Sequence, residues 1–187
     1  MTARIRNHSL WLMPDDAART RLERIIEDLS NTYCTPRFPA HVTLLAGVLQ
    51  PAHDVVATTR ALATAWKLRP LTLDLGRLAM TNNYFRCLFA RVDTSDELLA
   101  AHERLKSCFD VRSTDIFTPH LSLLYGELAQ TDKHAIVARL NHRYPGHITV
   151  REIAVFDTSG TPERWRQVGS VALAEPWHEP VRIKPGN

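Results

Sequence analysis

Two histidines stand at the start of two similar short segments. Residues 41–49 read HVTLLAGVL and residues 120–128 read HLSLLYGEL. In each segment a hydroxyl side chain, Thr43 or Ser122, follows the histidine two residues later. The histidine, two leucines, the glycine and the final leucine recur in step, and each copy follows a Phe and a Pro. Self-similarity of this kind predicts two related structural units, each with one His-x-(Thr/Ser) strand.

The paired histidines suit acid–base chemistry on a phosphodiester. An unperturbed histidine pKa of about 6.5 lets one ring be neutral while another is protonated near neutral pH. His41 and His120 could therefore take a proton from water and give one to the departing oxygen, and each transfer is worth about 10²- to 10⁴-fold. The hydroxyls of Thr43 and Ser122 could donate hydrogen bonds to the phosphoryl oxygens. Because a protonated histidine also offsets phosphate charge, we expect neither a metal nor another cofactor.

Strand geometry decides whether these side chains can meet. Residues i and i+2 of a strand point to the same face, so His41 lies with Thr43, and His120 with Ser122. If a pseudo-twofold axis relates the two units, both faces line one cleft. The alternative is a purely structural role, in which two duplicated core strands carry histidines that are buried and hydrogen-bonded. The tripeptide at 147–149 also reads His-x-Thr, but it lacks the following Leu-Leu-x-Gly and is assigned to an ordinary strand surface.

The rest of the chain predicts a mixture of strands and helices. Period-two and short apolar runs predict strands at 8–13, 41–49, 71–78, 84–92, 120–126, 147–156 and 165–173. Apolar residues at helical spacing predict helices at 14–30, 55–66, 94–105 and 132–143. With hairpins expected between adjacent strands, this order favours an α+β fold over a doubly wound parallel sheet. The proline-rich tail after residue 173 is expected to follow the surface.

Polar residues mark several element boundaries. Asp15 and Asp16 suit the start of the first helix as caps and against the helix dipole. Thr94 and Glu97 form a capping-box pattern that opens the third helix. The asparagines at 82–83 suggest a hairpin turn.

Length and composition are those of an ordinary globular protein. The chain has 187 residues, 44% hydrophobic and 23% charged, which suits one domain over residues 1–187 made of two similar lobes. No apolar run approaches the roughly 20 residues of a membrane helix. The apolar stretch at 10–13 is too short for a signal peptide, so we expect a cytoplasmic protein without membrane contact.

Net charge and cysteine content exclude few classes of protein, but both are compatible with an enzyme that binds a small anionic ligand. A net charge of +3 is too small to diagnose nucleic-acid binding, although it fits a small anionic ligand. Cys34, Cys87 and Cys108 are odd in number and follow no metal-ligand spacing. Reduced thiols are therefore expected rather than a disulfide framework or a zinc site.

At the motif residues the sequence resembles the two-histidine (2H) phosphoesterases, and within them the cyclic phosphodiesterases of plants and yeast. The segments SLWLMPDD, TPRFPAHVTLL, NNYFRCLF, FTPHLSLLYGEL and RWRQVGSV carry the resemblance over about residues 9–173. It implies a two-lobed, pseudo-twofold α+β fold, with antiparallel sheets lining a central cleft and helices outside. It also implies hydrolysis of nucleoside 2',3'-cyclic phosphates and of ADP-ribose 1″,2″-cyclic phosphate.

The resemblance assigns catalysis to the two motif histidines and phosphate binding to the two motif hydroxyls. Tyr125 matches a family tyrosine near the phosphate. Strict alternation puts Tyr125 on the opposite face from His120, so either the strand twists or bulges there or Tyr125 is a core residue. Ala46 occupies the matching position of the first copy, so a tyrosine contact would be one-sided and could orient the substrate.

Other residues allow two interpretations each. Trp11 and Tyr84 or Phe85 could stack on a base, although core packing is favoured. Arg37 could meet a phosphate or form a surface salt bridge. The histidines outside the paired motifs are assigned to surfaces or helix faces: His53, His102, His134, His142 and His178.

Three functions are compatible with these features. The first is a cyclic phosphodiesterase acting on small nucleotides. The second is an RNA 2',3'-cyclic phosphodiesterase or 2'-5' RNA ligase-like enzyme acting on RNA ends, for which a more basic groove is expected. The third is a non-catalytic nucleotide- or RNA-binding module, although binding alone does not require two titrating imidazoles. A monomer is favoured, and the sequence leaves open the substrate and which histidine is the base.

Overall fold

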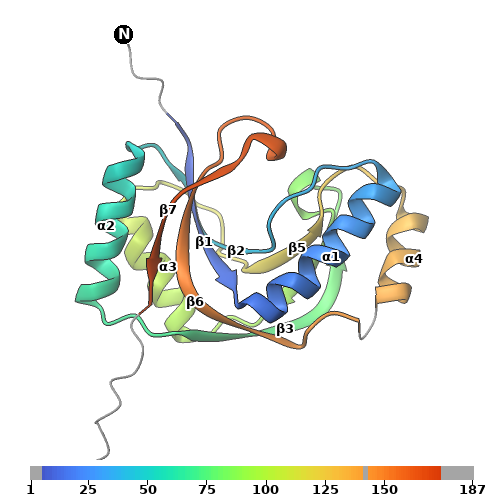
Figure 1. The fold of residues 1–187 in the computed structure, drawn as a ribbon, viewed down its shortest axis with the longest axis horizontal. Helices are drawn as coiled ribbons and strands as arrows, with labels where there is room; N and C mark the ends of the chain where they lie inside the picture. Colours follow the sequence, from blue (N-terminus) through green and yellow to red (C-terminus); the bar gives the residue numbers. More distant parts are fainter. Residues whose placement is uncertain (1–5, 141–142, 174–187) are drawn as a thin grey trace, which may run out of the picture.

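The computed structural model describes residues 6–140 and 143–173 of the protein (Figure 1). Its strands are β1 (His8–Pro14), β2 (Val42–Val48), β3 (Leu71–Met80), β4 (Leu88–Val92), β5 (His120–Leu124), β6 (His147–Asp157) and β7 (Arg166–Ala172). Its helices are α1 (Asp16–Tyr33), α2 (Ala52–Ala65), α3 (Asp96–Cys108) and α4 (Gln130–Leu140), with short 3-10 turns η1 (Tyr84–Arg86) and η2 (Pro162–Arg164). The predicted α+β class is confirmed. The tail after residue 173, His142 and His178 lie outside the described residues.

The strands form one sheet that closes on itself. Its order is β1-β2-β5-β4-β3-β6, and β6 pairs again with β1, so six antiparallel strands make a ring. Strand β7 lies outside the ring and pairs with the C-terminal half of β6. Strands β2 and β5, which carry the two motifs, are joined through the pair Val42–Leu121. The ring therefore brings together segments that are almost 80 residues apart in sequence.

The helices cover the outside of the ring in two pairs. Figure 1 shows α2 and α3 on one side and α1 and α4 on the other. Helix α2 packs against β6 and β7 and α3 against β2, while α1 contacts β1 and β5 and α4 contacts β3. Among the described residues, no helix has both the length and the apolar character needed to cross a membrane.

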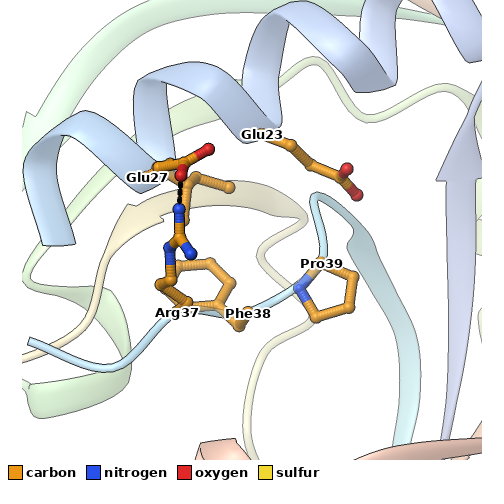
Figure 2. A pocket seen from close by; sticks show the side chains of 6 residues that line it. Glu23, Glu27, Arg37, Phe38 and Pro39 are labelled. Carbon is orange, nitrogen blue, oxygen red and sulfur yellow. Dashed lines mark ion pairs between the residues drawn. The ribbon is translucent and has the colours of Figure 1, made fainter. Parts of the chain in front are cut away.

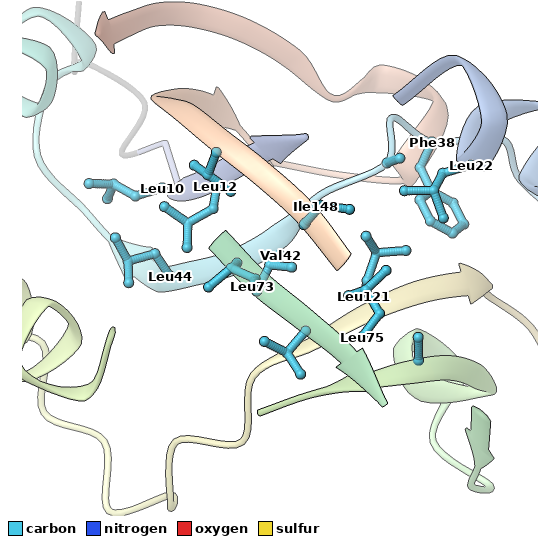
Figure 3. Packing of buried hydrophobic residues seen from close by; sticks show 14 of the residues in the cluster. Leu10, Leu12, Leu22, Phe38, Val42, Leu44, Leu73, Leu75, Leu121 and Ile148 are labelled. Carbon is cyan, nitrogen blue, oxygen red and sulfur yellow. The ribbon is translucent and has the colours of Figure 1, made fainter. Parts of the chain in front are cut away.

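Alternation along β1 separates the core from a second apolar cluster. Leu10 and Leu12 point into the main core, which also contains leucines and valines of the two motif strands (Figure 3). Trp11 and Met13 point to the opposite face and pack with Phe156 of β6. Both faces of β1 are buried, so this strand supports the side chains that pack on its Trp11 face.

One predicted cap is confirmed and another is displaced. The carboxylate of Asp15 accepts the N–H of Ala18 at 3.1 Å, as expected for the N-cap of α1. The capping box predicted at Thr94 is wrong by one residue. Helix α3 begins at Asp96, and the hydroxyl of Ser95 accepts the N–H of Leu98 at 3.2 Å, because Ser95 has the extended backbone that a cap requires.

The glycine that recurs in both motifs has a conformational reason. Gly47 has a φ of +82° and Gly126 a φ of +143°, values that residues with a Cβ seldom adopt. Gly47 lies one residue before the end of β2, and Gly126 follows the end of β5 by two residues. The repeat therefore preserves a backbone shape as well as a histidine.

The cysteines are free thiols, as predicted. Cys34 and Cys108 are exposed, whereas Cys87 is buried before β4. Burial raises the pKa of the Cys87 thiol, which disfavours the thiolate form that a nucleophile needs.

The close packing of α2 on β7 gives a first prediction. A Cβ added to Gly169 would lie 2.5 Å from Cγ2 of Val56, whose β-branched side chain has few alternative rotamers. We expect Gly169→Ala to lower the free energy of unfolding by about 1–3 kcal/mol in urea titration. The matched control is Gly146→Ala, where a Cβ meets no atom of the described residues within 4 Å. The control is expected to change stability by less than about 0.5 kcal/mol, and equal losses in both variants would contradict the packing argument.

Candidate active site

The register between the motif strands places four polar side chains together. Val42 of β2 pairs with Leu121 of β5 in antiparallel orientation. Continued by one residue on each side, this register sets each motif histidine opposite the hydroxyl of the other motif. All four side chains then share the face opposite to the main core.

A pocket of about 560 Å³ opens on this face. It is lined by every residue that the sequence singled out as catalytic or substrate-binding, namely His41, Thr43, His120, Ser122 and Tyr125. Ala46, the counterpart of Tyr125 in the repeat, also lines it. Two distant segments thus contribute to one cavity, as the pairing of the motifs required.

Both histidines are held in the same way by the backbone. Nδ1–H of His41 donates to the carbonyl of Pro39 at 2.6 Å, and Nδ1–H of His120 donates to the carbonyl of Thr118 at 2.8 Å. A carbonyl oxygen only accepts, so in each neutral ring the proton lies on Nδ1. Each Nε2 has no hydrogen-bond partner within the described part of the chain. Fixed tautomers and free Nε2 atoms are what proton transfer at a common ligand needs.

His41 is packed between other groups and is only 5% exposed. Its ring stacks on Trp11, with 3.5 Å between ring centroids and 9° between the planes. Burial lowers its pKa to about 4, and the positive charge of a protonated His120 acts in the same direction, while the hydrogen bond to Pro39 opposes them. His41 is therefore neutral at physiological pH.

His120 lies in a more open position. Its ring is half-buried and meets the ring of Phe89 edge-on at 5.2 Å. Burial lowers its pKa, and the charge of Arg86 lowers it further, against the opposing effect of the bond to Thr118. The two histidines thus share a backbone anchor but differ in exposure and in neighbouring charge.

The two motif hydroxyls also differ in their surroundings. The hydroxyl of Ser122 donates to the carbonyl of Phe85 at 3.0 Å, which fixes the η1 turn against β5. The hydroxyl of Thr43 has no partner among the residues that the structure describes, and it faces the pocket. Thr43 is therefore free to donate to a ligand, whereas the proton of Ser122 is already engaged.

Tyr125 reaches the pocket because the strand ends before it. Strand β5 stops at Leu124, so the alternation that would send Tyr125 away from His120 no longer applies. The Tyr125 ring stacks on Phe38 at 3.7 Å, and its hydroxyl contacts Ser122. Burial raises its pKa, so the phenol is protonated and can act as a hydrogen-bond donor.

The structure distinguishes between the two interpretations given for the aromatic residues and for Arg37. Trp11 has one face on His41 and the other on Phe156 at 3.9 Å, which leaves no free face for a base. Phe85 is 47% exposed and lines the pocket, whereas Tyr84 is not among its lining residues. Arg37 pairs with Glu27 in a separate cavity between α1 and the loop before β2 (Figure 2), so the surface salt bridge is the correct interpretation.

Several lining residues were not predicted from sequence, and three of them carry a charge or a large ring. Arg86 has a buried Nε without a hydrogen-bond partner, and its guanidinium lies 5.5 Å from the Phe89 ring centroid. Trp165 faces Phe85 across the pocket, with 5.9 Å between centroids and 26° between planes. Asp115 comes from the loop before β5. The strand predicted over 84–92 is wrong for residues 84–86, which form a 3-10 turn that redirects their side chains. The prediction therefore did not place Arg86 at the pocket.

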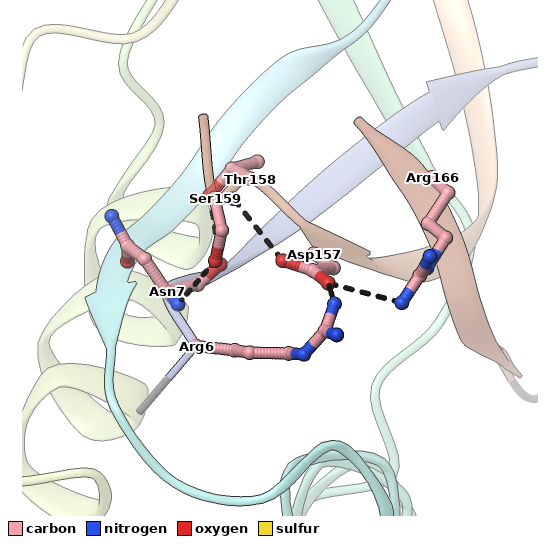
Figure 4. Close-up of polar contacts among 6 residues, drawn as sticks. All are labelled: Arg6, Asn7, Asp157, Thr158, Ser159 and Arg166. Atoms are coloured by element: carbon pink, nitrogen blue, oxygen red, sulfur yellow. Dashed lines mark hydrogen bonds and ion pairs between the residues drawn. The ribbon is translucent and has the colours of Figure 1, made fainter. Parts of the chain in front are cut away.

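A polar cluster lies at the start of the β6–β7 loop (Figure 4). This loop supplies Trp165 to the pocket. Asp157 pairs with Arg6 and, at 3.5 Å, with Arg166. Burial alone would raise the pKa of Asp157, but hydrogen bonds from Arg6 and Ser159 outweigh it and lower the pKa to about 2. The carboxylate is therefore charged throughout the physiological range and fixes the start of the loop.

Four other histidines of the described residues lie apart from the pocket. His53, His134 and His147 are exposed, as expected. His102 is buried on the inner face of α3, where its Nδ1–H donates to the carbonyl of Leu44 at 2.7 Å. Within residues 6–140 and 143–173, no three His, Cys, Asp or Glu side chains are grouped so that they could hold a metal ion.

Comparisons with known proteins agree with this geometry. A family model described as the 2'-5' RNA ligase superfamily matches residues 14–162. A cyclic phosphodiesterase of Arabidopsis thaliana is 30% identical over 126 residues, which are 67% of this chain and 68% of that protein. The crystal structure of E. coli LigT in its apo form has a TM-score of 0.58 at 16% identity, covering 91% of this chain and 99% of LigT. LigT complexed with 3'-AMP has a TM-score of 0.57 at 16% identity and the same coverage.

The match in sequence and the match in fold involve the same elements. The family model spans both motif strands, and the LigT structures share the arrangement of the sheet that pairs them. The chain therefore belongs to the 2'-5' RNA ligase superfamily, the two-histidine phosphoesterases that its paired motifs predict.

Proposed function

We propose that the protein hydrolyses cyclic phosphodiesters of nucleotides, namely nucleoside 2',3'-cyclic phosphates and ADP-ribose 1″,2″-cyclic phosphate, without a metal ion. The observation that carries this proposal is the pair of anchored imidazoles on one pocket face, each with Nε2 free. The Arabidopsis relative is named a cyclic phosphodiesterase, and LigT was solved with 3'-AMP, which supports a small nucleotide as substrate.

His41 acts as the general base in this proposal. Its burial against Trp11 keeps the ring neutral, so Nε2 can take a proton from water as the water oxygen attacks phosphorus. The hydrogen bond from Nδ1 to Pro39 then stabilises the imidazolium that forms. This is the arrangement of a base that is positioned before the substrate arrives.

His120 acts as the general acid. The bond between phosphorus and one ribose oxygen breaks, and Nε2 of protonated His120 supplies the proton that this oxygen needs to leave as a hydroxyl. The ring is more exposed than that of His41, so its protonation costs less, and a bound phosphate favours it further. The product is a phosphate monoester, and proton exchange with solvent restores both rings.

Phosphate oxygens are bound by unequal donors. Thr43 offers a free hydroxyl, and the buried phenol of Tyr125 can turn its proton from Ser122 to a phosphoryl oxygen. Ser122 acts through its contacts with Phe85 and Tyr125. Because Ala46 cannot replace Tyr125 in the first copy, the substrate is bound in one orientation.

RNA ends with a 2',3'-cyclic phosphate are a second candidate substrate. The observation in its favour is the match to the 2'-5' RNA ligase superfamily. The pocket chemistry is the same for both substrates, so only the length of the substrate separates the two candidates.

The first test supplies three substrates with and without EDTA. These are a nucleoside 2',3'-cyclic phosphate, ADP-ribose 1″,2″-cyclic phosphate and an oligonucleotide with a 2',3'-cyclic end. We expect the small nucleotides to be hydrolysed at rates that EDTA leaves unchanged, because the histidines and hydrogen-bond donors supply the catalytic groups. Loss of turnover with the chelator, restored by a divalent cation, would refute the metal-free mechanism. Preference for the oligonucleotide would select the second candidate.

A second test removes each imidazole. We expect His41→Ala and His120→Ala each to lower kcat by about 10²- to 10⁴-fold, since each removes one proton transfer. The matched control is His147→Ala, which alters the exposed histidine of the third His-x-Thr tripeptide and should keep full activity. Near-normal activity of either pocket variant would exclude that histidine from the mechanism.

The third test is the pH dependence of turnover. The reactive state has a neutral His41 and a protonated His120. Activity should fall as pH drops through the His41 pKa of about 4, because the base becomes protonated. It should also fall as pH rises through the His120 pKa, which lies below 6.5, because the acid loses its proton. We therefore expect kcat/KM to peak below pH 6.5 and kcat to peak at higher pH, where bound phosphate favours the imidazolium. A kcat/KM maximum in alkaline solution would contradict this electrostatic description.

A further inference from the structure

A second cavity, of about 280 Å³, adjoins the candidate active-site pocket. The two cavities share lining residues, among them Thr43, Arg86 and His120. The second cavity lies on the side of His120 towards α3, the helix that packs against β2. A ligand whose reacting phosphorus lies between the histidines can therefore extend directly into it.

Two cations line this second cavity, and neither has an acidic partner among the described residues. Lys106, in the last turn of α3, is half-buried and forms no ion pair with any residue in the described ranges. Arg86 lies on the shared wall, also without an ion pair among those residues, and its buried Nε lacks a hydrogen-bond partner. Partly buried cations that are unpaired lose hydration without compensation, which an anionic ligand would restore.

The other walls leave the positive charge largely uncompensated. Among the described residues that line either cavity, Asp115 is the one carboxylate. It is exposed at the rim, where its oxygen accepts a hydrogen bond from the hydroxyl of Ser113 at 3.1 Å. Most of the remaining surface is apolar, including Leu44, Val111 and Phe117. Two cations facing one carboxylate over an apolar wall favour a compact anion.

We propose that the second cavity binds a second phosphate group of the substrate, with Lys106 as its main ligand. Arg86 then lies between the two phosphates and contacts either of them. This inference rests on the proposed hydrolysis of cyclic phosphates and narrows the substrate class. The preferred substrates are nucleotides that carry, besides the cyclic phosphate, a 5'-phosphate, a diphosphate or a phosphodiester.

The test compares two substrates that differ only in the second phosphate. They are adenosine 2',3'-cyclic phosphate and the same compound with a 5'-phosphate. We expect the 5'-phosphorylated compound to have a kcat/KM about 5- to 10-fold higher, the magnitude of a charge-assisted contact in a partly screened cavity. Lys106→Met should remove most of this preference through KM, and it should leave the rate on the compound without the 5'-phosphate unchanged. Lys106→Arg should keep the preference, and Lys67→Met, at an exposed lysine after α2, should have no effect.

Further substrates identify the source of the second phosphate. ADP-ribose 1″,2″-cyclic phosphate supplies a diphosphate, and a dinucleotide with a 2',3'-cyclic end supplies a phosphodiester. The source whose kcat/KM depends most on Lys106 is the one that the cavity accepts. Equal rates on the matched adenosine compounds, or an equal loss on both in Lys106→Met, would overturn the inference while leaving the proposed function intact.

An equilibrium measurement keeps the inference testable if no substrate is turned over, which would count against the proposed function alone. Calorimetry with adenosine 3'-monophosphate and adenosine 3',5'-bisphosphate compares the two ligands without catalysis. We expect the bisphosphate to bind more tightly, and Lys106→Met to equalise the two affinities. Identical affinities in the unmodified protein would reject a second phosphate site.

Discussion

The pairing of β2 with β5 at Val42 and Leu121 is the constraint on which the rest of the structure depends. It joins two neighbouring strands of the six-stranded ring and sets the two motifs antiparallel, so that each histidine lies diagonally from the other on one face. A slip of one residue in this register would send one motif's polar side chains into the leucine core. The buried leucines and valines on the opposite face therefore specify the geometry of the pocket as much as the histidines do.

The two motifs hold their histidines with similar backbone contacts, but the surroundings of the two histidines differ. Each histidine donates Nδ1–H to the carbonyl two residues earlier, and each motif ends in a glycine with positive φ. The neighbours then differ, since His41 is covered by Trp11 whereas His120 is open and near Arg86. A duplicated frame can thus give two chemically distinct imidazoles, which acid–base catalysis requires, through the packing of single side chains.

The sequence predicts the frame and the central residues because both depend on local spacing. Periodicity placed the elements, and the repeat placed the histidines in one pocket. It could not place Tyr125, because strand alternation says nothing of where a strand ends. Nor could it place Arg86, Asp115 or Trp165, which reach the pocket from a 3-10 turn and two loops. Closure of the ring is also absent from the local pattern, since it depends on the pairing of β1 with β6 and of β2 with β5, which are far apart in sequence.

Substrate binding and protonation are coupled by the electrostatics of this pocket. In the free protein, burial disfavours the charged form of both histidines, and Arg86 disfavours it further at His120. A bound phosphate reverses this balance, because it supplies negative charge beside the imidazole and compensates Arg86 at the same time. Linkage requires the converse, so protonation of His120 strengthens the binding of the anion that it serves. In the proposed mechanism the substrate therefore helps to complete the general acid, because its phosphate favours the charged form of His120 that burial and Arg86 disfavour.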